Sequence, residues 1–476
     1  MHPPVESGPD GQRSGALRRV LLPLALAQFI CSFAGSNMNV MINDISQDLD
    51  TTVQGVQIAI TSFLLVMAAL MIPGGKLTDR YGRKRCFTAG LVLFGAGALL
   101  CAVAPGLGVL MLGYSILEGV GTALLIPPVY ILTTLLFSGV AGRARAFGAI
   151  SAMGGVGAAA GPLIGGLITS ALGWRWAFVF QALIVAAIVW LSRRVPDPLP
   201  PDPTRHFDTR GAVLSAAGLV LVVTGILAAD NSGWLMIGLM AAGALVLLLF
   251  FRWVREQERA GGEPLLSTAL FQNRTSNLGL VTQNAQWLVL MGSSFVVAAY
   301  LQVVRGYNAI ETGLIFTAAT AGLLTSSLAA GRLARRRPQR NLIMAGFVVT
   351  AAGIGTLLAM VIGTPKVWAF APGLLLIGLG IGLMLTPSVN VVQSSFGDDL
   401  QGEISGLSRS VSNLGSSLGT AIAGTVIVAG ITKTPERAYG LAMVVLAVVA
   451  LLGLAAAAFL PKPGLPVAGA PVPGEP

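Results

Sequence analysis

The sequence predicts an all-helical protein that crosses a membrane many times. Hydrophobic residues make up 54% of the 476 residues, charged residues make up only 11%, and the mean hydropathy is +0.78. Soluble domains carry about 25% charged residues, which cover a surface exposed to water. In addition, apolar segments of about 20 residues, enough to cross the hydrocarbon core as a helix, recur along the whole chain.

Fourteen segments have the length and hydropathy expected of membrane-spanning helices. The pair at 211–252 decides between fourteen spans and twelve. In order, the expected spans are 18–43, 55–75, 86–105, 108–134, 146–171, 176–192, 211–229, 234–252, 277–301, 311–331, 341–362, 367–390, 404–431 and 439–460. We expect the first span to be retained, because it is long and no small-residue cleavage site follows it.

Lysine and arginine residues are distributed unevenly between the two sides of these spans. With the N-terminus in the cytoplasm, 24 of the 30 fall in cytoplasmic tails and loops, 5 fall on the other side, and Arg409 lies within a span. Such a bias orients helical membrane proteins. We therefore expect an even number of spans in the cell membrane, with both termini cytoplasmic. Topology then explains the net charge of +10, and nucleic acid is excluded as a partner.

The fifth expected span carries a regular set of glycines. Gly157, Gly161 and Gly165 recur every four residues, so they share one face on which a neighbouring backbone can approach closely. Pro162 is expected to bend this helix. Such a groove indicates a mobile helix contact in a transporter, whereas the alternative is ordinary small-residue packing. The complete motif consists of Gly148, Gly157, Gly161, Pro162, Gly165 and Gly166.

A charged loop follows the second expected span. It reads Gly75-Lys76-Leu77-Thr78-Asp79-Arg80-Tyr81-Gly82-Arg83-Lys84-Arg85. Gly75 and Gly82 would permit a tight turn between two helices, and Asp79 would hold Arg83 near a helix N-terminus, where negative charge is favoured. With Arg80, this cluster would latch the cytoplasmic ends of two helical halves. The alternative is an ordinary basic loop.

These motifs resemble the signatures of a known transporter family. The loop matches the pattern G-x-L-x-D-R-x-G-R-[KR] of the major facilitator superfamily, and the glycine helix matches the fifth-helix antiporter signature of its exporters. Three further stretches resemble the fourteen-span drug:proton antiporter family, namely Gly173-Trp174-Arg175-Trp176, Phe207-Asp208-Thr209-Arg210-Gly211 and Tyr300-Leu301-Gln302. The resemblance implies alternating access around a midplane cavity and proton-coupled export of amphipathic or cationic small molecules.

The same resemblance implies a major facilitator fold of two six-helix bundles with two extra central helices. A degenerate copy of the loop, Gly331-Arg332-Leu333-Ala334-Arg335, lies half a chain later and has Arg335 in place of the acid. Its position is that expected of an internal duplication, and its lost acid assigns the latch to the first half. The expected divisions are a cytoplasmic N-tail at 1–17, a first bundle at 18–195, a linker with two spans at 196–276, a second bundle at 277–460 and a cytoplasmic C-tail at 461–476.

Two departures from the family pattern concern charge. In the first span, Ala34 stands where the family has an acid. In the fourth span, Ser115 stands where the family has arginine, and Glu118 stands where it has glutamine. The acid and the base that would cooperate in coupling are therefore both absent, and a new carboxylate lies about one helical turn from the lost base.

Glu118 is expected near the middle of its span, about ten residues and roughly 15 Å from one end. A charge there costs several kcal/mol, so we expect its side chain to face the central cavity, to carry the coupled proton and to meet a cationic substrate. By helical spacing, Tyr114, Ser115 and Thr122 would share its face. The alternative is a structural carboxylate that is hydrogen-bonded to a neighbouring helix.

Further polar residues in the spans are expected to point inward, because polar groups that face lipid are penalised. They would either line the cavity or form hydrogen bonds between helices. The candidates for the transport site are Asn37, Asn39, Gln283, Gln286, Asn390 and Arg409. Arg409 lies about a turn and a half inside its span, so it would either extend to the cytoplasmic interface or pair with a carboxylate.

No cofactor or metal site is expected. Cys31, Cys86 and Cys101 show no paired spacing, and both histidines lie in polar segments. No nucleotide-binding loop of the type G-x-x-x-x-G-K-[ST] occurs, so transport would be driven by an ion gradient or be passive. The family resemblance implies a proton gradient as the driving force. We expect a monomeric transporter in the bilayer, not an enzyme, that acts on protons and a small molecule. The alternatives are a facilitator or importer of a lipid or metabolite, and a membrane sensor or scaffold without transport.

Overall fold

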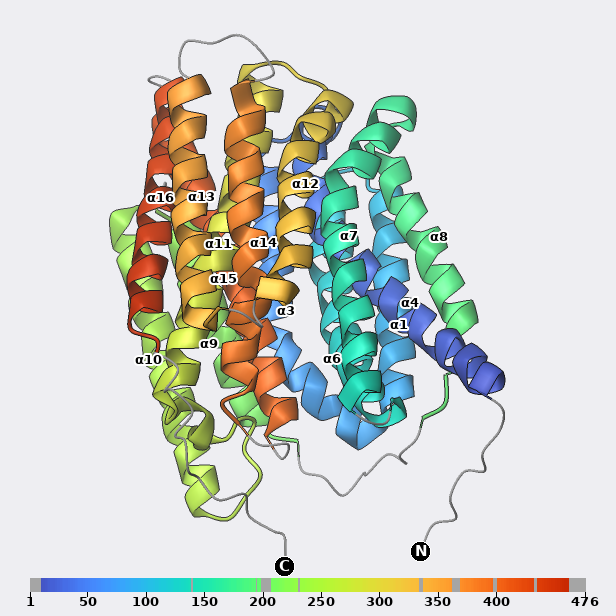
Figure 1. Cartoon of the computed structure of the whole chain (residues 1–476). Coiled ribbons are helices and arrows are strands. Elements are labelled where there is room, and N and C mark those ends of the chain that lie inside the picture. The colour runs from blue at the N-terminus through green and yellow to red at the C-terminus, as the bar shows by residue number, and fades with distance from the viewer. Residues whose placement is uncertain are drawn as a thin grey trace, which may run out of the picture.

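The computed structural model of the chain is a bundle of long helices (Figure 1). It describes residues 10–137, 140–193, 195–197, 207–229, 232–333, 337–361, 369–396, 400–431 and 435–461. Among these residues, 14 helices are long and apolar enough to cross a membrane, and no β-strand occurs. Each of the 14 overlaps one of the expected segments, so the predicted all-helical, fourteen-span fold is confirmed.

The first six spans include two irregular segments. The first span continues beyond α1 through a short 3₁₀ turn. The fourth contains a π-helix after its first α-helical turn, and the backbone hydrogen bonds of a π-helix are one residue wider than those of an α-helix. The elements are α1 (Asp10–Asn37), η1 (Met38–Met41), α2 (Ile42–Asp48), α3 (Val53–Tyr81), α4 (Arg83–Ala102), α5 (Leu107–Leu110), η2 (Met111–Glu118), α6 (Gly119–Leu136), α7 (Val140–Leu172) and α8 (Trp174–Ser192).

The remaining eight spans begin with a helical hairpin. Its two helices are α9 (Thr209–Leu227) and α10 (Gly233–Arg259). The last six spans also contain a π-helix, η4, at the end of α11. The elements are η3 (Thr268–Phe271), α11 (Arg274–Ala299), η4 (Tyr300–Val304), α12 (Ala309–Leu333), α13 (Gln339–Val361), α14 (Phe370–Gln393), α15 (Gln401–Ile431) and α16 (Pro435–Ala458).

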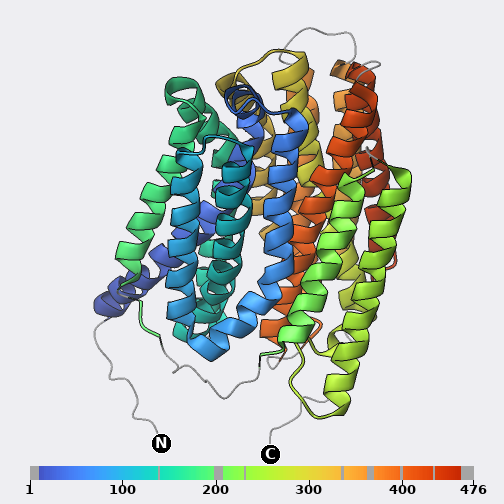
Figure 2. The ribbon, with the colours of Figure 1, turned by 180° about the vertical axis from the view of Figure 1, so that it is seen from behind.

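The first six and last six spans form two groups that lie side by side (Figures 1 and 2). The groups meet along two seams, where α3 packs against α15 and α7 packs against α12. Equivalent pairs recur within each group, since α1 packs against α7 as α11 packs against α15. This repetition agrees with an internal duplication. The described start of α1 and the end of α16 lie at the same end of the molecule (Figure 1).

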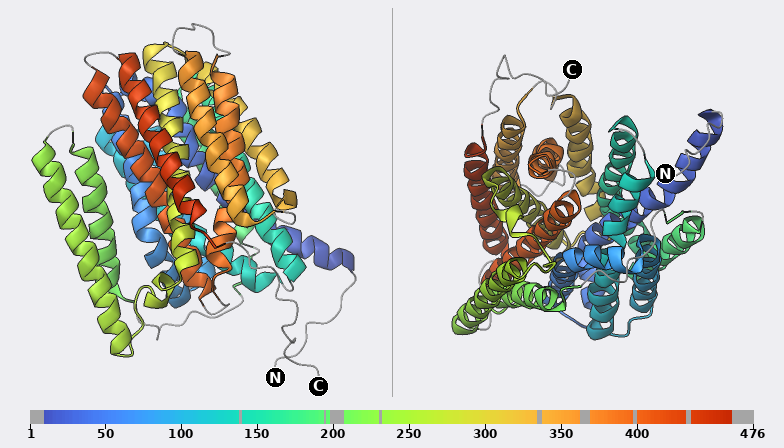
Figure 3. Two further views of the ribbon diagram at one scale, coloured as in Figure 1. Left: turned by 60° about the vertical axis from the view of Figure 1, so that its left-hand side comes forward. Right: turned by 90° about the horizontal axis from the view of Figure 1, so that it is seen from below.

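The hairpin α9–α10 lies on the outside of the bundle, beside the α3–α15 seam (Figure 3). On α9, Val223 forms an apolar cluster with Leu65 of α3 and Ala421 of α15, so that one helix contacts both groups. The Thr425 hydroxyl of α15 also donates a hydrogen bond to the Ile226 carbonyl of α9, at 3.3 Å. In contrast, only 11% of the apolar stretch of α10 is buried, as expected of a helix that faces lipid.

Candidate transport and coupling site

The glycine face of α7 packs directly against α1. A Cβ added at Gly157 would overlap the carbonyl oxygen of Phe29, and a Cβ added at Gly161 would overlap the hydroxyl of Ser36. At Gly165 the added Cβ would lie 3.0 Å from the Cβ of Asn37. This is the close approach that the four-residue spacing predicts. Gly148 lies on the same helix, but its surroundings lie outside the described residues.

The other end of this motif contacts the second half. A Cβ at Gly166 would overlap the Ala309 carbonyl of α12, and a Cβ at Gly313 of α12 would overlap the Pro162 carbonyl of α7. Pro162 is buried within α7, and the helix assignment continues through it. The six-residue motif therefore serves two contacts, one with α1 inside its own half and one with α12 across the α7–α12 seam.

The charged loop differs from its expected form. Helix α3 continues to Tyr81, so Gly75 lies inside the helix, and the prediction that it forms the turn is wrong. Gly82 alone makes the turn, with a φ of 95° that favours glycine. Arg83 is buried at the start of α4, and the Arg80 guanidinium lies 5.7 Å from the ring centre of Tyr81.

Among the described residues, Lys76 joins the two halves at the end of α3 that carries the charged loop. Its Nζ lies 2.8 Å from Oε1 of Glu403 on α15. The second carboxylate oxygen, Oε2, accepts a hydrogen bond from the backbone N–H of Ser267 at 2.9 Å, in the segment between α10 and α11. The side chain of Asp79, and residues 334–336 of the degenerate copy, lie outside the described residues. Lys76 and Glu403 were not singled out from the sequence as a pair.

Glu118 ends the π-helix η2 and is fully enclosed. Its side chain has no exposed surface, and neither carboxylate oxygen has a hydrogen-bond partner among the described residues. It packs toward α4, where a Cβ added at Gly97 would lie 2.9 Å from the Glu118 Cγ. The expectation that Glu118 lines an open cavity is therefore not met in this conformation. A π-helix changes the angular position of each side chain, which spacing rules for an α-helix do not anticipate.

The hydroxyl groups near Glu118 bind backbone carbonyls. Tyr114 donates to the Ala34 carbonyl of α1 at 3.0 Å, and Ser115 donates to the Ala59 carbonyl of α3 at 2.8 Å. Thr122 donates to the Glu118 carbonyl at 2.8 Å. Tyr114 and Ser115 thus fasten η2 to α1 and α3, whereas the Thr122 bond stays within its own span. None of the three side chains has exposed surface. The structure thus does not place them on a cavity wall shared with Glu118.

The other expected polar residues divide into bonded and unbonded groups. Gln283 accepts a hydrogen bond from Ser408, and Gln286 accepts one from Ser388, each at 2.9 Å, within the second half. The buried Asn37 side chain and the Asn39 Oδ1 have no partner among the described residues. Asn390 is partly exposed near the end of α14.

Gln302 in η4 joins the halves at the end opposite Lys76. Its Nε2 donates to the Asn39 carbonyl at 2.7 Å, and its Oε1 accepts from the Asn43 backbone N–H at 3.0 Å. One buried amide thereby binds both the 3₁₀ turn and the helix that end the first span. The sequence placed Gln302 in a family-like stretch, but its bonds to two backbone groups could not be inferred from that stretch.

Arg409 of α15 binds Tyr130 of α6, across the two halves. The guanidinium donates a hydrogen bond to the Tyr130 hydroxyl and lies 4.8 Å from the centre of its ring. The same hydroxyl donates to Oε1 of Gln28 on α1 at 3.2 Å. Arg409 therefore points across the seam between the halves and binds no carboxylate among the described residues. Tyr130 was missed by the sequence analysis.

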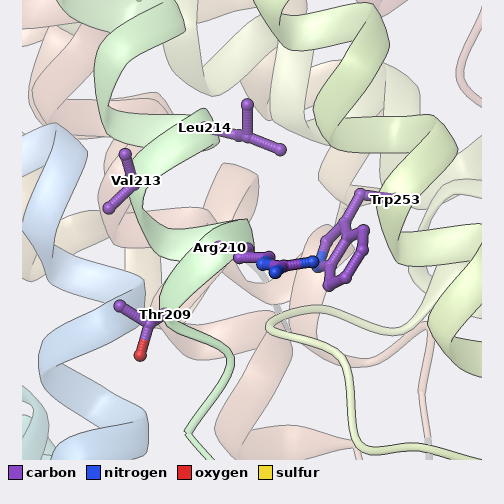
Figure 4. Close-up of a pocket in the computed structure, with 5 residues that line it drawn as sticks. All are labelled: Thr209, Arg210, Val213, Leu214 and Trp253. Atoms are coloured by element: carbon purple, nitrogen blue, oxygen red, sulfur yellow. The ribbon is translucent and has the colours of Figure 1, made fainter.

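A separate hollow of about 390 Å³ lies between α9 and α10. Figure 4 shows Arg210 of α9 beside Trp253 of α10, with the guanidinium 5.2 Å from the indole ring centre. The wall is completed by Thr209, Val213 and Leu214. Because all of these residues belong to the peripheral hairpin, this hollow lies outside the contacts between the halves.

Comparisons with known proteins place this arrangement in a family. A sequence model of the Major Facilitator Superfamily matches residues 24–214 and 209–420. Puromycin resistance protein pur8 of Streptomyces alboniger is 32% identical, over 89% of this chain and 84% of that protein. The probable actinorhodin transporter of Streptomyces coelicolor is 31% identical, over 88% and 75%. The crystal structure of the peptide transporter POT in complex with sulfate shares the fold, with a TM-score of 0.68 and 17% identity over 93% of this chain and 95% of that one.

The chain therefore belongs to the major facilitator superfamily and is a fourteen-span membrane transporter whose relatives include drug-resistance and export proteins.

Proposed function

We propose that the chain exports amphipathic small molecules from the cytoplasm in exchange for protons. It would do so in the cell membrane with both termini cytoplasmic, as the lysine and arginine distribution indicates. The names of its relatives, which include a puromycin resistance protein and a probable actinorhodin transporter, support export of such compounds. The family fold supports alternating access, in which two halves rock around a central site.

The enclosed carboxyl group of Glu118 is the observation that carries the proposal. An ionised carboxylate with no partner, removed from water, costs several kcal/mol. The enclosed conformation therefore favours the neutral acid, and release of the proton requires contact with water. A group that ionises in one conformation and is neutral in another couples proton movement to the conformational change.

The two contacts that join opposite ends of the halves supply the gates of the cycle. Lys76 and Glu403 would close the cytoplasmic end, while Gln302 would close the other end with the backbone of the first span. For alternating access, one contact must open while the other is closed. The proton on Glu118 would stabilise the conformation in which its surroundings are closed.

Transport by purified protein in proteoliposomes with an imposed pH gradient tests this function. The probe is rhodamine 6G, an amphipathic dye whose fluorescence reports its movement. We expect dye movement that collapses with a proton uncoupler and is lost in Glu118→Gln. Glu256→Gln is the matched control, because Glu256 is an exposed acid on α10. Gradient-driven movement that persists in Glu118→Gln would remove the coupling role from this residue.

The same assay separates the alternative functions. A facilitator would move dye down its own gradient with no response to the uncoupler. An importer of a lipid or metabolite would accumulate its compound on the cytoplasmic side instead. A sensor or scaffold would move no compound from a broad panel, with or without a gradient.

A further inference from the structure

A chain of hydrogen bonds crosses the two halves and begins at Arg409. Its guanidinium donates to Tyr130, Tyr130 donates to the Gln28 side chain, and the Gln28 Nε2 donates to the Ser32 hydroxyl at 3.2 Å. The chain thus passes from α15 through α6 to α1. Because each hydroxyl or amide accepts one bond and donates the next, the Tyr130 hydroxyl is oriented with its lone pair toward Arg409.

The neighbours of Arg409 on α15 fix its direction. Ser408 bonds to Gln283 of α11, and Ser410 donates to the Ala68 carbonyl of α3 at 2.5 Å. These contacts hold α15 against one helix of each half, so the intervening arginine is directed toward α6. Arg409 lies six residues beyond Glu403, which places it about 9 Å deeper than the Lys76–Glu403 pair.

The charged group that a molecule between the halves could contact is the positive guanidinium of Arg409. Among the described residues of the twelve spans that form the halves, Glu118 and Arg409 are the charged residues farthest from their span ends. Glu118 has no exposed surface, whereas Arg409 is partly exposed. The guanidinium carries five N–H donors, and one of them goes to Tyr130 in this structure.

We propose that Arg409 and Tyr130 form a recognition site for an acidic group on an aromatic substrate, such as a carboxylate or a phenolate. The acidic oxygen would replace the Tyr130 hydroxyl as the acceptor from Arg409, because an ionised acceptor forms the stronger bond. The aromatic body would lie against the guanidinium plane and the Tyr130 ring. The proposed recognition site rests on the export function proposed above. It favours an anionic substrate, whereas the sequence led us to expect a cationic one.

Substrate binding at this site also acts on the contact between the halves. The Arg409–Tyr130 bond joins α15 to α6, so a ligand that takes over the guanidinium breaks a bond across the seam. A ligand shifts a conformational equilibrium by the difference between its binding free energies for the two conformations. Recognition and opening would therefore involve the same arginine.

Binding of two xanthene dyes to the purified full chain tests the site. Fluorescein is anionic and rhodamine 123 is cationic, and fluorescence polarisation measures the affinity of each without requiring transport. We expect wild-type protein to prefer fluorescein. Arg409→Gln should weaken fluorescein binding about tenfold, the loss of one charge-assisted bond, and leave rhodamine 123 within about twofold. Tyr130→Phe should keep or raise fluorescein affinity, because it removes the competing acceptor and keeps the ring.

The controls distinguish recognition from a structural effect. Arg274→Gln removes an exposed arginine at the start of α11 and should change neither dye. Thermal unfolding of each variant reports whether it folds. Equal weakening of both dyes in Arg409→Gln, a preference of wild type for rhodamine 123, or binding of neither dye would overturn the site. Proton-driven transport of rhodamine 6G alongside any of these results would leave the proposed export function intact.

Discussion

The Nζ of Lys76 lies 2.8 Å from Oε1 of Glu403, across 327 residues of sequence and between the two halves of the transporter. The two side chains retain 30% and 23% of their exposure. A partly solvated ion pair contributes only about 0–1 kcal/mol, whereas a fully buried pair would resist separation. The pair therefore stabilises a closed end weakly enough for the conformational cycle to break it.

Reversing one charge of this pair should open the end of the molecule at which Lys76 and Glu403 meet. In Lys76→Glu we expect the population with separated ends of α3 and α15 to rise about fivefold, equivalent to roughly 1 kcal/mol. Distances between spin labels on the two helix ends would measure it. The double change Lys76→Glu with Glu403→Lys should restore the wild-type distribution. Lys84→Glu is the control, because the Lys84 ammonium bonds within the first half, to the Arg193 carbonyl. A distribution that the double change fails to restore would speak against pairing as the cause.

Loss of the Gln302 amide should open the other end. Gln302→Leu leaves the Asn39 carbonyl and the Asn43 N–H without their partner, at a cost of about 1–3 kcal/mol for each buried group. A cysteine at the buried Met41 position should then react about tenfold faster with a water-soluble maleimide. Gln47→Leu serves as the control, since the Gln47 side chain is exposed and its bond to the Asn43 side chain, at 3.2 Å, is a local one. Unchanged labelling would show that Gln302 does not hold this end closed.

The glycine groove should tolerate no side chain where it meets backbone. Gly157→Ala places a methyl group on the Phe29 carbonyl, which has no side-chain freedom to move aside. We expect a loss of about 1–3 kcal/mol and a lower unfolding temperature. Gly155→Ala is matched to it two residues earlier, where the nearest atom is Leu324 Cδ2 at 3.9 Å. Equal unfolding temperatures for both variants would contradict the close packing of the groove against the α1 backbone.

Removal of Asp208 should loosen the peripheral hairpin. Its carboxylate accepts bonds from the Gly211 N–H at 2.8 Å, the Trp253 indole at 2.9 Å and the Leu265 N–H at 3.2 Å. Asp208→Ala should cost about 1–2 kcal/mol from the lost helix cap and speed hydrogen exchange in the first turn of α9. Asp208→Asn keeps an acceptor and should lose less. Exchange that is equally fast in both variants would point to charge, not capping, as the cause.

The sequence was sufficient for the spans and the α7 groove, because both depend on local spacing and hydropathy. The glycine repeat predicts a close approach without specifying its partner, and the structure supplies α1 and α12. The Lys76–Glu403 pair and the Arg409–Tyr130 bond could not be predicted in this way, since each joins residues that only the packed halves bring together. Glu118 shows a different limit. Its span position was predicted, but its direction was not, because the π-helix Met111–Glu118 departs from the α-helical angle between residues.

Helix α9 makes the two seams unequal toward the bilayer. At the α3–α15 seam, Val223 packs against Leu65 and Ala421, so the line along which the halves meet is covered by protein there. Lipid chains can press on the junction of the halves mainly from the α7–α12 side. For the proposed rocking of the halves, we therefore expect bilayer thickness and lipid composition to act as a lateral force applied to one side of the molecule.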